Sequence, residues 1–207
     1  MTEIAQASPE PGAGAQPSGK TAGEPARVVP GQPDMWVLVL FESLLFTAYF
    51  AVYLFHRTAD SEAFLRSQAQ LSAWLGTLDT LLLLASSLFM LWCVQATRAG
   101  AFRSAMANAW ITGLLGVAFL VSKVTEWIKL VRGGHSFTAN EFFQYYFFLT
   151  GIHLLHLLIG FVVIGVIIYQ LRSPARRSRD LVETCAVYWH TVDLLWVLIF
   201  SLLYVVR

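Results

Sequence analysis

The sequence predicts an all-α integral membrane protein, a bundle of five transmembrane helices that follows a disordered N-terminal tail. Two observations predict this fold class. Hydrophobic residues make up 57% of the chain, against roughly 45 to 50% in soluble domains, and the mean hydropathy is +0.60. In addition, five apolar runs are long enough to cross a hydrocarbon core about 30 Å thick at about 1.5 Å per residue.

The N-terminal segment, residues 1–34, is predicted to be a disordered tail. It holds six of the seven prolines and five glycines and contains no apolar run. Such a segment cannot bury enough surface to offset the entropy lost on ordering. It also lacks the charged start and apolar core of a signal peptide, so we expect it to remain on the mature protein. Residues 35–207 form the predicted membrane domain.

The five predicted spans alternate with short polar connections, and the basic residues predict their orientation. Lys and Arg favour cytoplasmic loops. With the N-terminus in the cytoplasm and the C-terminus outside, eight of these residues lie on the cytoplasmic side and five on the other side. Four of the eight lie in the connection 172–179. The net charge is +1 and the sequence has no dense basic cluster, so it does not predict a basic surface that could bind nucleic acid. The expected spans are 35–56, 73–97, 106–130, 141–171 and 181–206.

The first span carries a carboxylic acid, Glu42, about 10 Å inside the predicted membrane boundary. Tyr49, Tyr53 and His56 follow it on nearly the same helical face. One interpretation is a proton-handling carboxylate. The other is a neutral acid that hydrogen-bonds to a neighbouring helix, because an isolated charge at this depth is costly.

The second and third spans contain three further charged residues. Asp79 lies near the start of the second span, where we expect a first-turn or interfacial residue. Lys123 and Glu126 are three residues apart in the third span and can neutralise each other as an ion pair. We expect Lys123, like Lys129, to extend its ammonium group towards the membrane surface.

The fourth span contains His153 and His156, which share a helical face. Two histidines at this spacing could bind a metal, or could each meet another histidine across a haem. A metal site needs further ligands and a haem needs an opposed pair, so we expect hydrogen bonds between helices instead. Small residues here and in the third span mark places where helices can approach closely: Gly113, Gly116, Gly151, Gly160 and Gly165.

The last span has a polar stripe on an otherwise apolar helix. His190 and Asp193 are three residues apart in YWHTVDLLWVLIF, so we expect them to form a hydrogen bond or ion pair. Helical steps extend the same face over Glu183, Val187, His190, Asp193, Val197, Ser201 and Tyr204. A stripe of this kind is expected to face other helices.

Taken together, the motifs resemble those of the haem-copper oxidase subunit III family, which includes cytochrome c oxidase subunit III. The similar segments are LFESLLF, LDTLLLLASS, KVTEW, TGIHLLHLLIG and the last span, where Glu183, Tyr188, Trp189, His190, Asp193 and Trp196 match in order and spacing. The chain lacks two N-terminal helices of the full family form and resembles its five-helix bacterial versions. Its HTVDLLWVLIFSLLYVVR ending is most similar to the nitric oxide reductase-associated branch, NorE, and Lys123 stands where the family usually has Gln.

The resemblance implies a non-catalytic accessory subunit of the bacterial inner membrane, with no haem, copper or other cofactor of its own. Such a subunit packs against the catalytic haem-copper subunit of an oxidase or a nitric oxide reductase and supports its assembly, stability and proton uptake. Glu42 matches the family's carbodiimide-reactive glutamate. Membrane phospholipid is a further implied partner, held between the first two helices of the full form and the remaining five.

Two other functions are compatible with individual features of the sequence. A small membrane b-type cytochrome would use His153, His156 and His190 as haem ligands, and a visible spectrum of the purified chain would reveal it. A transporter is less well supported, because five spans cannot divide into two equal repeats. No nucleophile elbow, Gly-rich phosphate loop, HExxH or CxxC motif is present, so the sequence shows no self-contained active site.

Overall fold

The computed structural model describes residues 33–206, and within this part of the chain helices are joined by loops and turns, without a strand. Five of its helices are long and apolar enough to cross a membrane, which confirms the predicted fold class. The predicted tail lies outside the described residues except for Pro33 and Asp34, which begin the first helix. The elements are α1 Pro33–Ala59, α2 Ser61–Gln68, α3 Ala73–Arg98, α4 Phe102–Arg132, α5 Glu141–Arg172, η1 Pro174–Arg176, α6 Arg179–Phe200 and the π-helical turn η2 Ser201–Val205.

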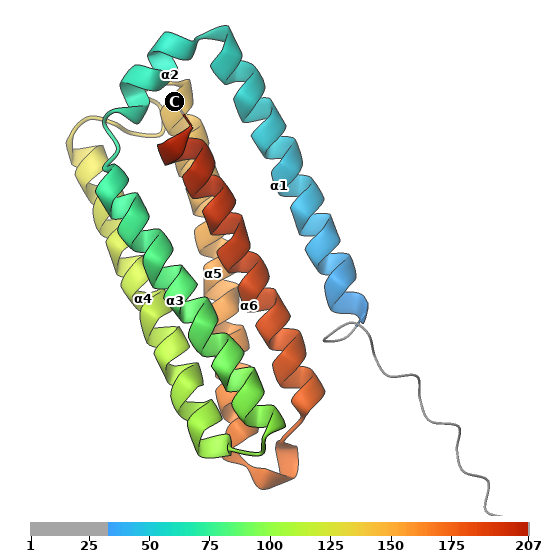
Figure 1. Ribbon diagram of the computed structural model, residues 1–207. Helices are drawn as coiled ribbons and strands as arrows, with labels where there is room; N and C mark the ends of the chain where they lie inside the picture. The colour runs from blue at the N-terminus through green and yellow to red at the C-terminus, as the bar shows by residue number, and fades with distance from the viewer. Residues whose placement is uncertain (1–32, 207) are drawn as a thin grey trace, which may run out of the picture.

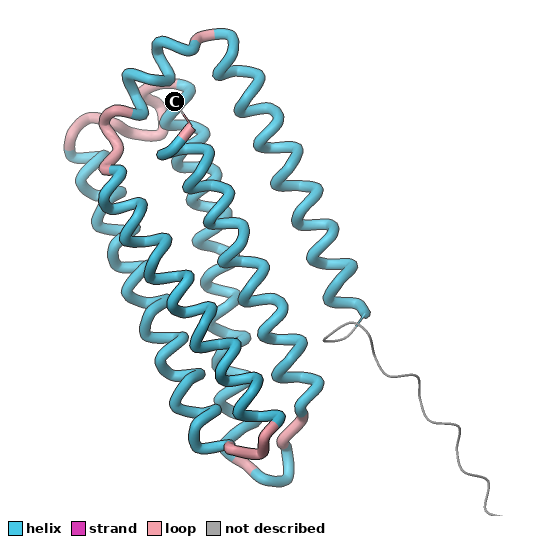
Figure 2. The backbone as a smooth tube through the Cα atoms, in the orientation of Figure 1, coloured by secondary structure: helices cyan, strands magenta, loops and turns pink. Residues whose placement is uncertain are grey.

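Helices α3, α4, α5 and α6 form a four-helix bundle, and α1 lies along its side (Figure 1). The connections α3–α4 and α5–α6 lie at the end of the bundle where α1 begins, and the C-terminus lies at the opposite end (Figure 2). The four spans after α1 end within about two residues of their predicted C-terminal limits. The side of the membrane on which each end lies stays a prediction from the basic residues.

The short helix α2 between the first two spans was not predicted. Its sequence SEAFLRSQ is brief and polar, so it gives no signal in a search for apolar runs. The Asp60 side chain caps its N-terminus by accepting a hydrogen bond from the Ala63 amide at 3.3 Å. On its inner face Phe64 is buried and meets the rings of Tyr53 and Phe142 edge-on. Helix α2 therefore covers the end of the α1–α5 contact.

Helix α1 is attached to α5 mainly through aromatic side chains. The Tyr49 ring lies 5.1 Å from that of Phe148, and the Tyr53 ring lies 5.6 Å from that of Tyr145. The Tyr145 hydroxyl is 2.7 Å from His56 Nδ1. The stripe predicted on the first span therefore faces α5, and its large rings hold α1 against the bundle.

Two glycines form a slot for the Trp189 indole in the bundle core. A Cβ atom at Gly160 would lie 2.8 Å from Trp189 Cζ3, and one at Gly116 would lie 3.0 Å from Trp189 Cη2. The indole nitrogen donates to Ser86 Oγ at 3.1 Å, so the same side chain also bonds α3. The predicted close approach is confirmed at these two glycines. At Gly165 a Cβ would meet nothing within 4 Å, so that glycine does not mark a close contact.

Candidate functional site

A buried polar cluster lies near the C-terminal end of the bundle core, where α3, α4, α5 and η2 come together. We refer to Asp79, Lys123, Glu126, Tyr146 and Tyr204 as the central cluster. Asp79, Lys123 and Tyr146 are 0% exposed, and the other two side chains are 4% exposed. Charged groups at such depth are normally paired, because burial of an unpaired charge is costly.

Lys123 is held between two carboxyl groups. Its Nζ lies 2.6 Å from Glu126 Oε2 on the same helix and 2.9 Å from Asp79 Oδ2 on α3. It also donates a hydrogen bond to the Tyr204 hydroxyl at 3.1 Å. One ammonium group thus connects α3, α4 and η2.

Glu126 has the richer set of partners of the two acids. Its Oε2 accepts from Lys123, from the Tyr146 hydroxyl at 3.1 Å and from the Tyr204 hydroxyl at 2.9 Å. Among residues 33–206, neither oxygen of Asp79 has an aligned hydrogen-bond partner, so the ion pair with Lys123 is the main contact that offsets its burial. The two acids therefore differ in the number of their contacts, and the burial of the Asp79 carboxyl group depends mainly on its ion pair with Lys123.

Aromatic rings enclose the lysine. Lys123 Nζ is 4.5 Å from the centroid of the Trp196 ring and 5.3 Å from that of Tyr204, within the range of cation–π attraction. Trp196 is fixed by its indole N–H, which donates to Thr80 Oγ1 at 3.2 Å. Tyr204 can approach because Gly76 has no side chain; a Cβ there would lie 2.8 Å from Tyr204 Cδ1.

The structure corrects two predictions for this region and confirms a third. The Lys123–Glu126 ion pair is present. Lys123 does not extend to the membrane surface, because Asp79, Glu126 and Tyr204 supply inside the bundle the acceptors that water would supply at the surface. The interfacial assignment of Asp79 is also wrong, since its carboxyl group faces this lysine in the core.

The last-span stripe faces other helices, as predicted, but its expected internal pair is absent. Glu183 accepts a hydrogen bond from Arg98 Nε of α3 at 2.7 Å, and the Ser87 hydroxyl of α3 is 2.6 Å from His190 Nδ1. Asp193 is 3% exposed, and neither of its oxygens has a hydrogen-bond partner among the described residues. The predicted His190–Asp193 pair is therefore wrong, because His190 is directed to α3 instead.

The two histidines of α5 differ in their contacts. His156 Nε2 is 3.1 Å from Glu42 Oε2, an inter-helix contact of the predicted kind. His153 is fully buried, and neither ring nitrogen has a hydrogen-bond partner in the described part of the chain, so the prediction is wrong there. Its ring packs edge-on to Phe119 at 5.6 Å and lies 5.2 Å from the Trp196 ring.

The proposed haem ligands of the cytochrome alternative do not converge. His153 faces α4 and α6, His156 faces α1, and His190 faces α3. Within residues 33–206, no group of three or more His, Cys, Asp or Glu side chains is arranged to hold a metal ion. The described geometry gives the cytochrome alternative no support.

Sequence reasoning missed the contribution of Tyr146 and of the small hydroxyl residues. Tyr146 lies in the aromatic run EFFQYYFF, in which nothing indicates which ring points inward. Ser86 donates to the Thr112 carbonyl at 3.1 Å and accepts from Trp189, linking α3, α4 and α6. A serine pair inside an apolar span was the available signal for this contact.

Comparison with known proteins identifies the family. The sequence model of the family "Cytochrome c oxidase subunit III" matches residues 32–206, which covers the whole helical domain. The chain belongs to the cytochrome c oxidase subunit III family. It is 31% identical to cytochrome c oxidase subunit 3 of Thermostichus vulcanus over 172 residues, which are 82% of this chain and 84% of that protein. It is 32% identical to the same subunit of Synechocystis sp. over 184 residues, 84% and 77% of the two chains.

A third relative carries two subunits in one chain. The chain is 27% identical over 185 residues to "Heme-copper oxidase subunit I+III" of Aeropyrum pernix; the match covers 83% of this chain and 22% of that protein. Family membership and the five long apolar helices show a multi-pass bacterial membrane protein. The resemblance found in the sequence is thereby confirmed at the level of the subunit III family.

The Tyr204 hydroxyl provides a specific test of the cluster. We expect Tyr204→Phe to lower the free energy of unfolding by about 1 to 3 kcal/mol, because Glu126 and Lys123 each lose a buried hydrogen-bond partner. Thermal unfolding of the purified chain in detergent measures the effect. Tyr49→Phe is the matched control: it removes a hydroxyl from a ring that is 36% exposed and should change stability by less than about 0.5 kcal/mol. Equal effects of the two substitutions would contradict the assignment.

Proposed function

We propose that this chain is a non-catalytic accessory subunit of a membrane haem-copper oxidase, which packs against the catalytic subunit and supports its assembly and stability. The observation that carries the proposal is the family match over residues 32–206, together with relatives named subunit 3 of cytochrome c oxidase. The polar side chains of the central cluster, which point into the bundle, suit a structural role.

The catalytic subunit I is the proposed partner. In the relative from Aeropyrum pernix the name assigns subunits I and III to one chain, which supports a neighbouring position of the two in the complex. In this chain the subunit III match covers residues 32–206.

A finer proposal concerns the reaction of the complex. The C-terminal segment 190–207 and Lys123 in place of the family's usual Gln support an association with a nitric oxide reductase. The relatives described above are named as oxidases, which supports an oxygen-reducing partner. The identity of the co-isolated catalytic subunit distinguishes these two partners.

We further propose that Glu42 makes a structural contact and does not carry protons for the catalytic subunit. Its carboxyl group bridges α1 to His156 of α5, while Phe46, one turn along α1, packs edge-on to the same imidazole at 5.8 Å. These contacts support an anchoring role, since α1 otherwise meets α5 through a few aromatic rings and the contact between the Tyr145 hydroxyl and His56.

Isolation under mild conditions tests the accessory function. An affinity-tagged chain, extracted in mild detergent from its native membrane, should carry a haem-copper catalytic subunit and the haem spectrum of that subunit. The same chain expressed without the partner should show no Soret band. A Soret band in the chain alone would contradict the proposal and favour the cytochrome alternative, and a native preparation without any haem-copper subunit would contradict the proposed partner.

Glu42→Gln tests the structural assignment of the acid. Glutamine keeps the shape and a hydrogen-bond acceptor for His156 but cannot exchange a proton. We expect the variant complex to assemble and to turn over within about twofold of the wild type across the pH range, since a proton-transfer residue would contribute about 10²-fold or more. Turnover and assembly are measured on the same preparation, with Glu62→Gln on the exposed face of α2 as the control. A fully assembled Gln variant with slowed or pH-shifted turnover would establish proton handling.

A further inference from the structure

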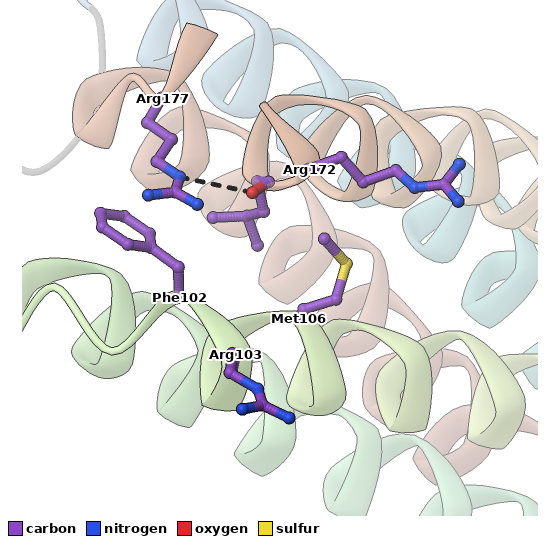
Figure 3. A pocket seen from close by; sticks show the side chains of 6 residues that line it. Phe102, Arg103, Met106, Arg172 and Arg177 are labelled. Carbon is purple, nitrogen blue, oxygen red and sulfur yellow. Dashed lines mark hydrogen bonds between the residues drawn. The ribbon is translucent and has the colours of Figure 1, made fainter. Parts of the chain in front are cut away.

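A pocket of about 390 Å³ lies at the end of the bundle where α4 begins and α5 ends (Figure 3). It is far from the central cluster, which lies towards the opposite end of the same helices. Three arginines and three apolar side chains line it: Phe102, Arg103, Met106, Leu171, Arg172 and Arg177. Figure 3 shows Arg177 beside the Phe102 ring, while the side chains of Arg103 and Arg172 extend outward from the pocket.

Arg177 is held in place over this pocket. Its Nε donates to the Leu171 carbonyl at 3.4 Å, and its guanidinium carbon lies 3.8 Å from the centroid of the Phe102 ring (Figure 3). The hydrogen bond uses one of the five guanidinium donors. The remaining donors are available at the pocket, and their position is set before any ligand arrives.

The charges of the three arginines are not neutralised within the described part of the chain. Arg103, Arg172 and Arg177 form no ion pair with a described carboxylate, whereas Arg98 at the same end of the bundle pairs with Glu183 at 2.7 Å. Three arginines that line one pocket create a positive potential that favours an anion, and guanidinium geometry suits phosphate oxygens in particular.

The position of the pocket indicates which source of phosphate it suits. Phe102 is the first residue of α4 and Arg172 the last of α5, so the pocket lies where two membrane spans end. Met106 continues its apolar wall towards the membrane interior, and Trp110, one helical turn further, is 57% exposed. A ligand with a phosphate at this depth and a hydrocarbon chain below it matches both parts of the lining.

We propose that this pocket binds the headgroup of an anionic phospholipid. The phosphate binds at the Arg177 guanidinium, the exposed Arg103 and Arg172 line the same pocket, and an acyl chain follows α4 from Met106 towards Trp110. The site differs from the lipid cleft that the family resemblance implies, which lies between the first two helices of the full form and the remaining five. The proposal concerns the chain itself and does not depend on which catalytic subunit it accompanies.

Lipid retention by the full-length chain tests the proposal. The purified chain is titrated with phosphatidylglycerol or phosphatidylcholine in mixed micelles, and bound lipid is counted by native mass spectrometry. We expect one phosphatidylglycerol to be retained in preference to phosphatidylcholine, and each Arg→Gln change at the three positions to weaken its binding about fivefold. Arg→Lys should weaken binding less than Arg→Gln, because it keeps the charge but not the guanidinium geometry. Arg132→Gln, at the opposite end of α4, is the matched control and should bind as the wild type does.

Four results would overturn the proposal. Equal retention of the two lipids, or binding unchanged by the Gln substitutions, would show that the arginines do not select an anionic headgroup. Inorganic phosphate that binds alone as tightly as phosphatidylglycerol would indicate a site for a soluble anion. Gln variants that retain lipid but lose their co-isolated subunit would indicate an acidic protein segment. Lipid is counted on the chain alone, so the lipid proposal can fail while the accessory function holds. The accessory function can likewise fail while the chain still binds the lipid.

Discussion

The buried ammonium group of Lys123 imposes the strongest physical constraint on this bundle. Lys123 is 0% exposed, so the protein itself must provide the opposite charge, and it does so with Asp79 from α3 and Glu126 from α4. Removing one partner of a buried ion pair typically costs about 3 to 5 kcal/mol, because the remaining charge is left without compensation. Tyr146 and Tyr204 extend the same contact to α5 and to the end of α6. The cluster therefore fixes the positions of four helices relative to one another.

The packing of two large aromatic side chains is consistent with the helix positions that the central cluster fixes. Tyr204 reaches the cluster because Gly76 leaves room for its ring, and Trp189 occupies the slot between Gly116 and Gly160 towards the other end of α6. Helix α1 lies outside this four-helix core, and its contacts to α5 are few and largely aromatic (Figure 1). A rigid core with its polar groups directed inward leaves an apolar outer surface, which suits a subunit surrounded by lipid and by other membrane subunits.

The sequence predicted the spans and the faces of the helices well, because hydrophobic periodicity reports directly on both. It predicted individual partners less well. His190 and Asp193 share a face, yet only the structure shows that Ser87 of α3 is the partner of His190. Lys123 was expected at the surface because the burial of a lysine depends on an acid from another helix, Asp79, and no pattern within one span indicates that contact. The short polar helix α2 was missed for a different reason, since it lacks the apolar run that identifies a span.

The most direct test of the central constraint is the thermal unfolding midpoint of three variants in detergent, measured together. Lys123→Met leaves two buried acids without their cation, whereas Lys123→Met combined with Asp79→Asn and Glu126→Gln removes all three charges. The account predicts that the single variant is destabilised by about 3 to 5 kcal/mol and that the triple variant recovers a substantial part of this loss. Lys129→Met on the exposed side of α4 should have little effect. A single variant as stable as the wild type, or a triple variant no more stable than the single, would contradict the account.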